Sequence, residues 1–420
     1  MKKNIAVFIV SIFSLVTYSQ SEKVEVHQTK TGVTLQVNGK NFMVNGMNWD
    51  YFPIGKNYSY QLWEQPEDFI KKALDHEMGL LKNMGVNTIR VYTGIPKKWI
   101  EYIHSNFGIY TLLNHSFGRY GVAVDGNWMP NTDYADPKVK QSLLKEVQQL
   151  ASDYKDTKGL LLYLLGNENN FGLFWQGAET ENVPVEDKKS TKLATAMYQL
   201  FNEAALAIKT KDVSHPVAIC NGDLLFLNLI AKECPAVDVL GINVYRGISF
   251  GDLFERVKKE YGKPVLLTEF GSDAFNAISK KEDQLAQATI LKGNWMEVYE
   301  NAAGQQKSQN CIGGFTFQFS DGWWKMGQTT NLEVHDTSAS WANGGYVFDY
   351  EKGKNNMNEE WFGICAKSKA PDHEVYALQP RIAYYVLKEV HQINPYAKRN
   401  MGKKLQKKFN AIVEKNSEMK

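Results

Sequence analysis

The stretch Leu160-Leu-Leu-Tyr-Leu-Leu-Gly-Asn-Glu168 is a continuous apolar run that ends in a carboxylate, and it has a counterpart in Pro264-Val-Leu-Leu-Thr-Glu269-Phe-Gly. A run of this kind predicts a strand that is buried on both faces, as in a parallel sheet covered by helices. A glutamate at its end lies where the chain leaves the core, and its desolvation is costly unless it has partners or a task. The two runs therefore predict a pair of carboxylates at one end of a parallel sheet.

Short apolar runs alternate with helical patterns along the rest of the chain. Asp136-Pro137 is typical of a helix start, and Gly85 and Gly262 are typical of helix ends. The eight strand candidates are residues 46–49, 87–92, 109–114, 160–166, 216–220, 237–244, 264–268 and 312–319. Strand and helix alternating in this way predict an α/β protein with a (β/α)₈ TIM barrel, in which the carboxyl ends of the strands carry the functional groups.

A hairpin and three long connections complete the predicted barrel. Asn38-Gly39 lies between two apolar runs and predicts a short amino-terminal β-hairpin, because this dipeptide supplies the positive φ values of a two-residue turn. Segments 116–136, 169–187 and 320–378 lack clear periodicity and follow predicted strands. Loops of this length tend to be functional. The third, a long insertion after strand 8, is expected to form a lid or a wall of a substrate cleft.

The first 20 residues have the three regions of a secretory signal peptide: Lys2 and Lys3, an apolar stretch over residues 5–16, and a polar end. The apolar stretch is too short to span a membrane comfortably, so an uncleaved anchor is the lesser alternative. We expect a signal peptide at 1–20, a catalytic barrel at 21–397 and a Lys-rich tail at 398–420 that forms a solvated helix. The mature protein is expected to be secreted or periplasmic, with no membrane span after signal cleavage.

Composition excludes several other classes. The 420-residue chain is 43% apolar with a formal net charge of +2, which gives it no electrostatic commitment to nucleic acid. The eight histidines show no paired ligand spacing, and the chain has no Walker-type loop and no Gly-x-Ser-x-Gly elbow. We therefore expect no metal, no cofactor and no nucleic-acid partner. The four cysteines are interpreted first as small core residues, with a single disulfide as the alternative.

A pair of carboxylates at one sheet edge meets the chemical requirement of glycoside hydrolysis. One group protonates the leaving oxygen, while the other attacks the sugar or activates a water. The alternative for either glutamate is a structural ion pair with an arginine.

Residues at four predicted strand ends resemble the signature of glycoside hydrolase clan A. They are Gly166-Asn167-Glu168 at the fourth strand, Thr268-Glu269-Phe270 at the seventh, Arg90 at the second and Tyr245 at the sixth. Residues 37–48 also resemble the entry to the catalytic barrel of family 2 and family 5 enzymes, although Asn243 stands where family 5 enzymes commonly have His. The resemblance implies a retaining glycosidase that forms a covalent glycosyl-enzyme.

The resemblance also implies a role for each of these residues. Glu168 would be the general acid/base, with a pKa raised by burial and by the second carboxylate. Glu269 would be the nucleophile, kept ionised by the Arg90 guanidinium and the Tyr245 hydroxyl. Asn167 would hold the sugar 2-hydroxyl.

Three further residues complete the predicted site. His115, at the end of the third strand, is expected to contact the sugar, with a plain loop histidine as the alternative. Trp323 suits stacking on the apolar face of a pyranose, whereas its neighbour Trp324 is expected to pack. Trp49 is open between a sugar subsite and the core.

We therefore expect an exported retaining β-glycoside hydrolase that cleaves a poly- or oligosaccharide by double displacement. Two alternatives stay open: a β-glucanosyl-type transglycosylase with the same residues, and a non-catalytic carbohydrate-binding barrel. The sequence indicates neither the sugar nor the oligomeric state. Arg119, Arg246 and Lys325 would suit a uronate carboxylate if they face the cleft.

Overall fold

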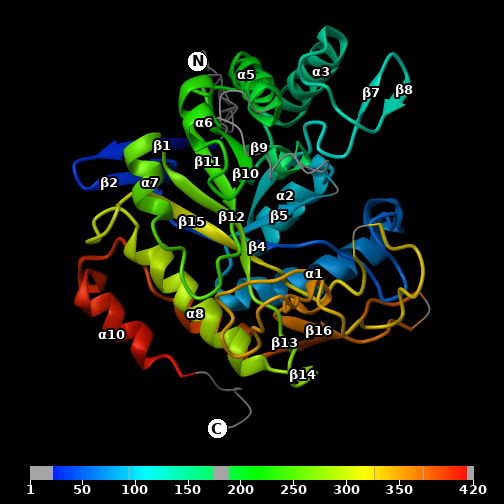
Figure 1. The fold of residues 1–420 in the computed structure, drawn as a ribbon, viewed down its shortest axis with the longest axis vertical. Helices are drawn as coiled ribbons and strands as arrows, with labels where there is room; N and C mark the ends of the chain where they lie inside the picture. Colours follow the sequence, from blue (N-terminus) through cyan, green and yellow to red (C-terminus); the bar gives the residue numbers. More distant parts are fainter. Residues whose placement is uncertain (1–21, 93, 174–188, 326, 372, 414–420) are drawn as a thin grey trace, which may run out of the picture.

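A computed structural model describes residues 22–92, 94–173, 189–325, 327–371 and 373–413. Eight parallel strands close into a barrel, in which consecutive strands are neighbours and the last pairs with the first (Figure 1). These strands are β4 (Val44–Asn48), β5 (Thr88–Val91), β6 (Tyr110–His115), β9 (Leu160–Leu165), β10 (Val217–Gly222), β11 (Val239–Asn243), β12 (Val265–Gly271) and β15 (Cys311–Phe317). Each overlaps one predicted strand, with ends that differ by at most three residues. The predicted (β/α)₈ barrel is confirmed.

Helices surround the barrel, as Figure 1 shows. They include α1 (Glu67–Met84), α2 (Lys97–Phe107), α3 (Pro137–Tyr154), α5 (Lys189–Lys209), α6 (Leu227–Glu233), α7 (Leu253–Glu260), α8 (Gln284–Glu300) and α9 (Ile382–His391). The carboxylate of Asp136 caps α3 by accepting from the backbone N–H groups of Lys138 and Val139. Gly85 ends α1 with a φ of 88°, a left-handed conformation that favours glycine. These ends agree with the predicted start and stop signals.

A small antiparallel sheet closes the amino-terminal end of the barrel. It consists of β1 (Val24–Thr29), β2 (Gly32–Val37) and β3 (Lys40–Phe42). Asn38 and Gly39 form the predicted turn between β2 and β3, with φ values of 50° and 76°. Val24, Leu35 and Val37 belong to the same buried cluster as side chains of the barrel strands. Because this sheet covers one end, the carboxyl end of the barrel is the one left for a site.

Connections of very different lengths lie at the carboxyl end. β6 is followed by the hairpin β7 (Val122–Val124) and β8 (Asn127–Met129), β9 by the short helix α4 (Asn169–Gly172), and β12 by the hairpin β13 (Phe275–Asn276) and β14 (Lys281–Glu282). The loop after β4 contains η1 (Leu62–Glu64). The insertion after β15 contains η4 (Glu359–Trp361) and the pair β16 (Cys365–Lys367) and β17 (Leu378–Pro380), and Figure 1 shows it beside β13.

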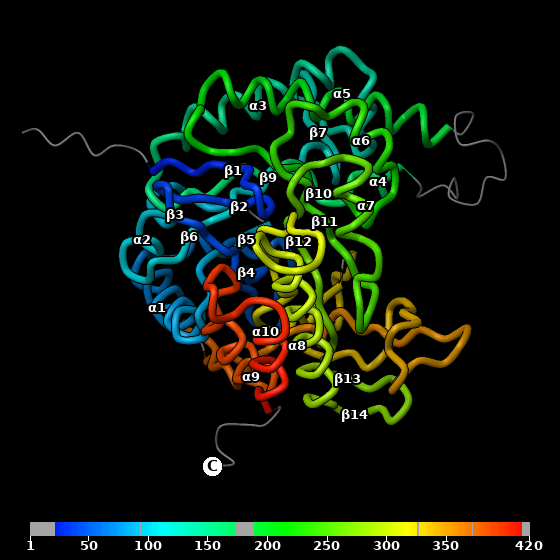
Figure 2. The backbone as a smooth tube through the Cα atoms, turned by 90° about the vertical axis from the view of Figure 1, so that its left-hand side faces the viewer, coloured from blue at the N-terminus to red at the C-terminus, as the bar shows by residue number. Residues whose placement is uncertain are grey.

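The chain ends with η5 (Lys398–Asn400) and α10 (Lys403–Ala411). Figure 2 shows α10 alongside α8 and α9, and the ring of Phe409 packs at 5.7 Å from that of Tyr299. The predicted signal peptide at 1–20 lies outside the described residues. Within the part of the chain that the structure describes, no helix is both long and apolar enough to cross a membrane. All four cysteines are buried and free.

Candidate active site

Glu269 lies in β12 and is held by three donors from two other strand ends. Nη1 of Arg90 lies 2.9 Å from Oε1, and the hydroxyl of Tyr92 donates to the same oxygen at 2.5 Å. The hydroxyl of Tyr245 donates to Oε2 at 2.9 Å. Burial raises the pKa of both tyrosines well above the ordinary range, so they stay protonated donors. Three hydrogen bonds, one of them from a guanidinium cation, stabilise the carboxylate anion of Glu269.

Arg90 is fully buried and contacts most of the polar groups at this end of the barrel. Besides Glu269, its guanidinium donates to five oxygens: Asn114 Oδ1 at 2.9 Å, Asn167 Oδ1 at 2.8 Å, the Thr268 carbonyl at 3.1 Å, the Tyr92 hydroxyl at 3.1 Å and Asn243 Oδ1 at 3.4 Å. A buried guanidinium is tolerated only when its charge is paired and its donors are used. The residues around Arg90 meet both conditions.

Glu168 follows β9 and has a backbone φ of 57°, which is unusual for a residue other than glycine. Its N–H donates to the carbonyl of Cys220 at 3.1 Å, and its Oε1 accepts from Nδ2 of Asn243 at 3.1 Å. Burial, followed by the charge of Glu269, raises the pKa of Glu168 to about 7. This carboxyl group can therefore carry a proton near neutral pH, as a general acid must.

Asn243 connects the surroundings of the two carboxylates. Its Oδ1 accepts from the hydroxyl of Thr268 at 2.8 Å, and its Nδ2 donates both to Glu168 and to Oδ1 of Asn167 at 3.1 Å. Donors on one side and acceptors on the other define the orientation of this amide. From the sequence alone, Asn243 stands out only as a departure from the family 5 pattern. Its position two residues before Tyr245, on the same strand face, is the signal that could have identified it.

Asn167 precedes Glu168 in the chain and is hydrogen-bonded to Arg90. Its Oδ1 accepts from Arg90, and its Nδ2 donates to the hydroxyl of Tyr120 at 2.9 Å. The structure thus brings together Glu168, Glu269, Asn167, Arg90 and Tyr245 from four segments of the chain. It adds Tyr92, Asn114 and Asn243, which the sequence analysis did not include in the site.

The side chain of His115 does not reach the residues around Glu168 and Glu269, which argues against the expected contact with the sugar. Successive side chains of a strand point to opposite faces. Asn114 points inward to Arg90, so His115 points outward, where Nε2 lies 3.3 Å from Oε2 of Glu146 on α3. Its Nδ1 accepts from the N–H of Phe117 at 3.1 Å.

Trp49 and Trp323 also have surroundings that differ from the expected ones. Trp49 is 2% exposed, and its indole N–H donates to Oε2 of Glu77 on α1 at 2.5 Å, so it belongs to the core between β4 and α1. The ring of Trp323 stacks on that of His335 with centroids 4.5 Å apart, and His335 stacks in turn on Trp361. One face of Trp323 is therefore covered by the insertion after β15.

Aromatic side chains surround Tyr245, one of the two tyrosines that donate to Glu269. Phe317, at the end of β15, lies edge-on to both Tyr92 and Tyr245, with centroid distances of 6.5 and 6.3 Å. Trp341, from the insertion, lies 5.4 Å from the ring of Tyr245. Apolar rings beside a carboxylate pair suit the apolar face of a sugar. Phe317 falls inside a predicted strand, and Trp341 lies in the insertion that was expected to form a lid or a wall of a substrate cleft; from the sequence, Trp341 stays open between a sugar subsite and the core.

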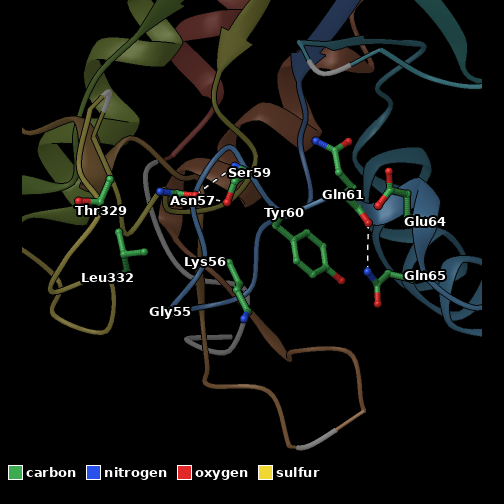
Figure 3. A pocket seen from close by; sticks show the side chains of 10 residues that line it. All are labelled: Gly55, Lys56, Asn57, Ser59, Tyr60, Gln61, Glu64, Gln65, Thr329 and Leu332. Carbon is green, nitrogen blue, oxygen red and sulfur yellow. Dashed lines mark hydrogen bonds between the residues drawn. The ribbon is translucent and has the colours of Figure 1, made fainter.

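A cavity of about 600 Å³ lies at the same end of the barrel, between the loop after β4 and the insertion (Figure 3). Its lining residues are Gly55, Lys56, Asn57, Ser59, Tyr60, Gln61, Glu64, Gln65, Thr329 and Leu332. Neither Glu168 nor Glu269 belongs to this lining, so the cavity is separate from the carboxylate pair. Among the described residues, no group of three or more His, Cys, Asp or Glu side chains is arranged to hold a metal ion.

Comparisons with known proteins agree with this geometry. A family model described as glycosyl hydrolases family 2, TIM barrel domain, matches residues 28–384. A search of curated proteins found no match. Similar solved structures include a GH2 β-galacturonidase from Eisenbergiella tayi bound to galacturonate, with a TM-score of 0.53, 16% identity, and coverage of 90% of this chain and 55% of that one.

Two further solved structures are similar in fold. A β-D-glucuronidase from Dictyoglomus thermophilum has a TM-score of 0.52 and 16% identity, with coverage of 89% of this chain and 54% of that one. A β-glucuronidase from Bacteroides uniformis has a TM-score of 0.55 and 13% identity, with coverage of 88% and 37%. The chain thus spans about half the length, or less, of these structures.

Proposed function

Because this chain belongs to glycosyl hydrolase family 2 through its TIM barrel domain, we propose that it is a retaining β-glycoside hydrolase that acts by double displacement. The proposal depends on one observation: two carboxylates at the same end of the barrel have opposite environments. Glu269 accepts three charge-stabilising hydrogen bonds, whereas Glu168, which is half-buried, has a pKa that desolvation and the charge of Glu269 raise to about 7.

Each step of the reaction then has a residue that performs it. Glu269 attacks the anomeric carbon while the carboxyl group of Glu168 gives its proton to the departing glycosidic oxygen, which leaves a covalent glycosyl-enzyme. The resulting Glu168 carboxylate takes a proton from water, and the oxygen of that water displaces Glu269 from the sugar. The proton that Glu168 lost is thereby restored.

Neighbouring residues support these two roles. Asn243 donates to Glu168 and, together with Arg90, to Asn167, so the acid and its neighbour are fixed relative to the ion pair of Glu269. We propose that Asn167 contacts the sugar next to the reacting carbon, because its amide lies directly beside Glu168. We propose that the protein is exported, in line with the signal-like first 20 residues, and that its substrate is a poly- or oligosaccharide.

Proton NMR of the first sugar product tests the mechanism directly. A β-glycoside should release the β-anomer before mutarotation, whereas initial release of the α-anomer would contradict retention. The alanine variant of Glu168 provides a second test, because azide should restore turnover of an activated aryl glycoside and form a β-glycosyl azide. Products longer than the substrate would indicate a transglycosylase with the same residues.

A further inference from the structure

The insertion after β15 places two aromatic side chains, Trp341 and Phe362, against Tyr245, which donates to Glu269. We call this pair the aromatic wall. The ring of Trp341 meets that of Tyr245 at 5.4 Å and an interplanar angle of 73°. Behind them, Phe362 lies 5.7 Å from Tyr245 and is stacked with Trp341 at 6.3 Å. The N–H of Met357 donates to the carbonyl of Trp341 at 2.8 Å, which joins two segments of the insertion.

A third carboxylate contacts this aromatic wall. Oε1 of Glu359, in η4, accepts from the indole N–H of Trp341 at 3.1 Å. Within the part of the chain that the structure describes, Oε2 of Glu359 makes no hydrogen bond. Burial raises the pKa of Glu359, and the charge of Glu269 also raises it, whereas the Trp341 N–H and the charge of Lys325 lower it. The geometric link to the site is Trp341, whose N–H donates to Glu359 and whose ring lies 5.4 Å from that of Tyr245, the donor to Glu269.

Two of the cations that suited a uronate are already paired with aspartates. Nζ of Lys325 lies 2.6 Å from Oδ2 of Asp336 and also donates to the carbonyl of Ser338. Arg246 forms ion pairs with Asp223 at 2.5 Å and Asp252 at 3.3 Å. The insertion therefore places a carboxylate beside the aromatic residues of the site, and Lys325, whose charge acts on Glu359, is itself paired with Asp336.

We propose that Glu359, positioned by Trp341, determines the sugar specificity of the site by accepting hydroxyl groups of an uncharged sugar and by repelling a uronate. The inference rests on the proposed function and deepens it. A carboxylate is acceptor-only and can take two sugar hydroxyls, whereas a sugar carboxylate in the same place would meet a like charge in a poorly hydrated site. The solved structures named above are called β-galacturonidase or β-glucuronidase, and this chain is inferred to differ from them in substrate class.

Matched pairs of substrates test the inference. The 4-nitrophenyl β-glucoside is compared with the β-glucuronide, and the β-galactoside with the β-galacturonide. Neutral β-glucan, β-galactan and β-mannan are compared with alginate by reducing-end release. The full chain is expected to prefer the neutral member by at least about 100-fold in kcat/KM.

The variant Glu359→Gln keeps the shape and removes the charge. It should lose about 10-fold to 100-fold in kcat/KM on the preferred neutral substrate and should discriminate at least about tenfold less against the uronide. Glu351→Gln is the matched control, because Glu351 is an exposed residue of the same insertion that pairs with Lys354. Thermal unfolding of both variants shows whether either one changes the fold.

The outcomes are distinguishable. A preference of the parent protein for the uronide, or unchanged discrimination in Glu359→Gln, would overturn this inference and leave the proposed function standing. Failure to cleave any neutral or uronic glycoside of the panel would overturn the proposed function and this inference with it.

Discussion

Nη1 of Arg90 lies 2.9 Å from Oε1 of Glu269, and the arginine is fully buried. This ion pair joins the second and seventh strands of the barrel, β5 and β12. A buried ion pair is weak evidence for stability, because desolvation offsets much of its attraction. The same guanidinium also donates to Asn167, beside the proposed acid. Arg90 therefore positions groups on both sides of the site.

Removing the charge of Arg90 should affect stability and activity together. Arg90→Met keeps much of the volume and leaves Glu269 buried without its counter-charge, which is expected to cost about 3–5 kcal/mol in the free energy of unfolding. We expect kcat/KM to fall by at least about 100-fold. Arg90→Lys keeps the charge without the planar set of donors. Its stability and its kcat/KM should lie between those of the parent protein and those of Arg90→Met. Urea unfolding and steady-state kinetics check this, and a fully stable Arg90→Met would contradict it.

The alkaline limb of the pH profile should report Glu168. Its pKa is raised to about 7, and the first step needs the protonated form, so kcat/KM should fall as the pH rises through about 7. Asn243 donates to Glu168 and favours the charged form, so Asn243→Ala should move this limb to higher pH. A limb that stays in place or moves to lower pH would contradict the assignment.

The same shift has a consequence for stability. Because the folded pKa of Glu168 lies above the ordinary value of 4.5, the folded state binds the proton more tightly than the unfolded state. The contribution of Glu168 to the free energy of unfolding is fully present below pH 4.5 and is lost as the pH rises through about 7. Glu168→Gln should remove this part of the pH dependence, which urea unfolding at several pH values measures.

Asn114 and His115 are consecutive residues with opposite expected effects. Asn114→Ala removes the acceptor of the Arg90 Nε–H, and an unsatisfied buried donor costs about 1–3 kcal/mol, so both stability and kcat/KM should fall. His115→Ala affects contacts with Glu146 and Phe117 and should leave kcat/KM within about threefold. Kinetics of the two variants decide the matter. A raised KM in His115→Ala alone would restore the sugar contact predicted from the sequence.

Trp49 should matter for folding and little for turnover. Trp49→Phe removes the N–H that donates to the fully buried Glu77 and should lower the free energy of unfolding by about 1–3 kcal/mol. Chemical denaturation measures this loss, and kcat and KM should change little. A changed KM at unchanged stability would place Trp49 in a sugar subsite.

The barrel could be predicted from the sequence because its signal is local. Continuous apolar runs such as residues 160–165 are buried on both faces, and their carboxyl ends meet at one end of the barrel. This argument was sufficient to bring Glu168, Glu269, Arg90 and Tyr245 together. It did not predict β1, whose exposed and buried residues do not form a clean alternation.

The other differences between the predicted site and the structure arise from tertiary contacts, which the sequence pattern does not encode. The inward or outward direction of His115 depends on where the pairing of β6 begins, and a shift of one residue exchanges the faces. The contacts of Trp341 and Glu359 come from an insertion without periodicity, where only packing against the barrel decides which side chains reach the site. The sequence position of Trp49 left it open between a sugar subsite and the core, and the hydrogen bond to a carboxylate on α1 places it in the core.

The identity of the nucleophile is the central claim, and covalent labelling tests it most directly. The 2,4-dinitrophenyl 2-deoxy-2-fluoro-β-glycosides of the gluco, galacto and manno series should inactivate the protein, because the fluorine slows release of the glycosyl-enzyme more than its formation. Peptide mass spectrometry should find one fluoro-sugar on the peptide that contains Glu269, and none in Glu269→Gln. Attachment to any other residue, or turnover of the labelled substrates without a trapped sugar at Glu269, would contradict the account.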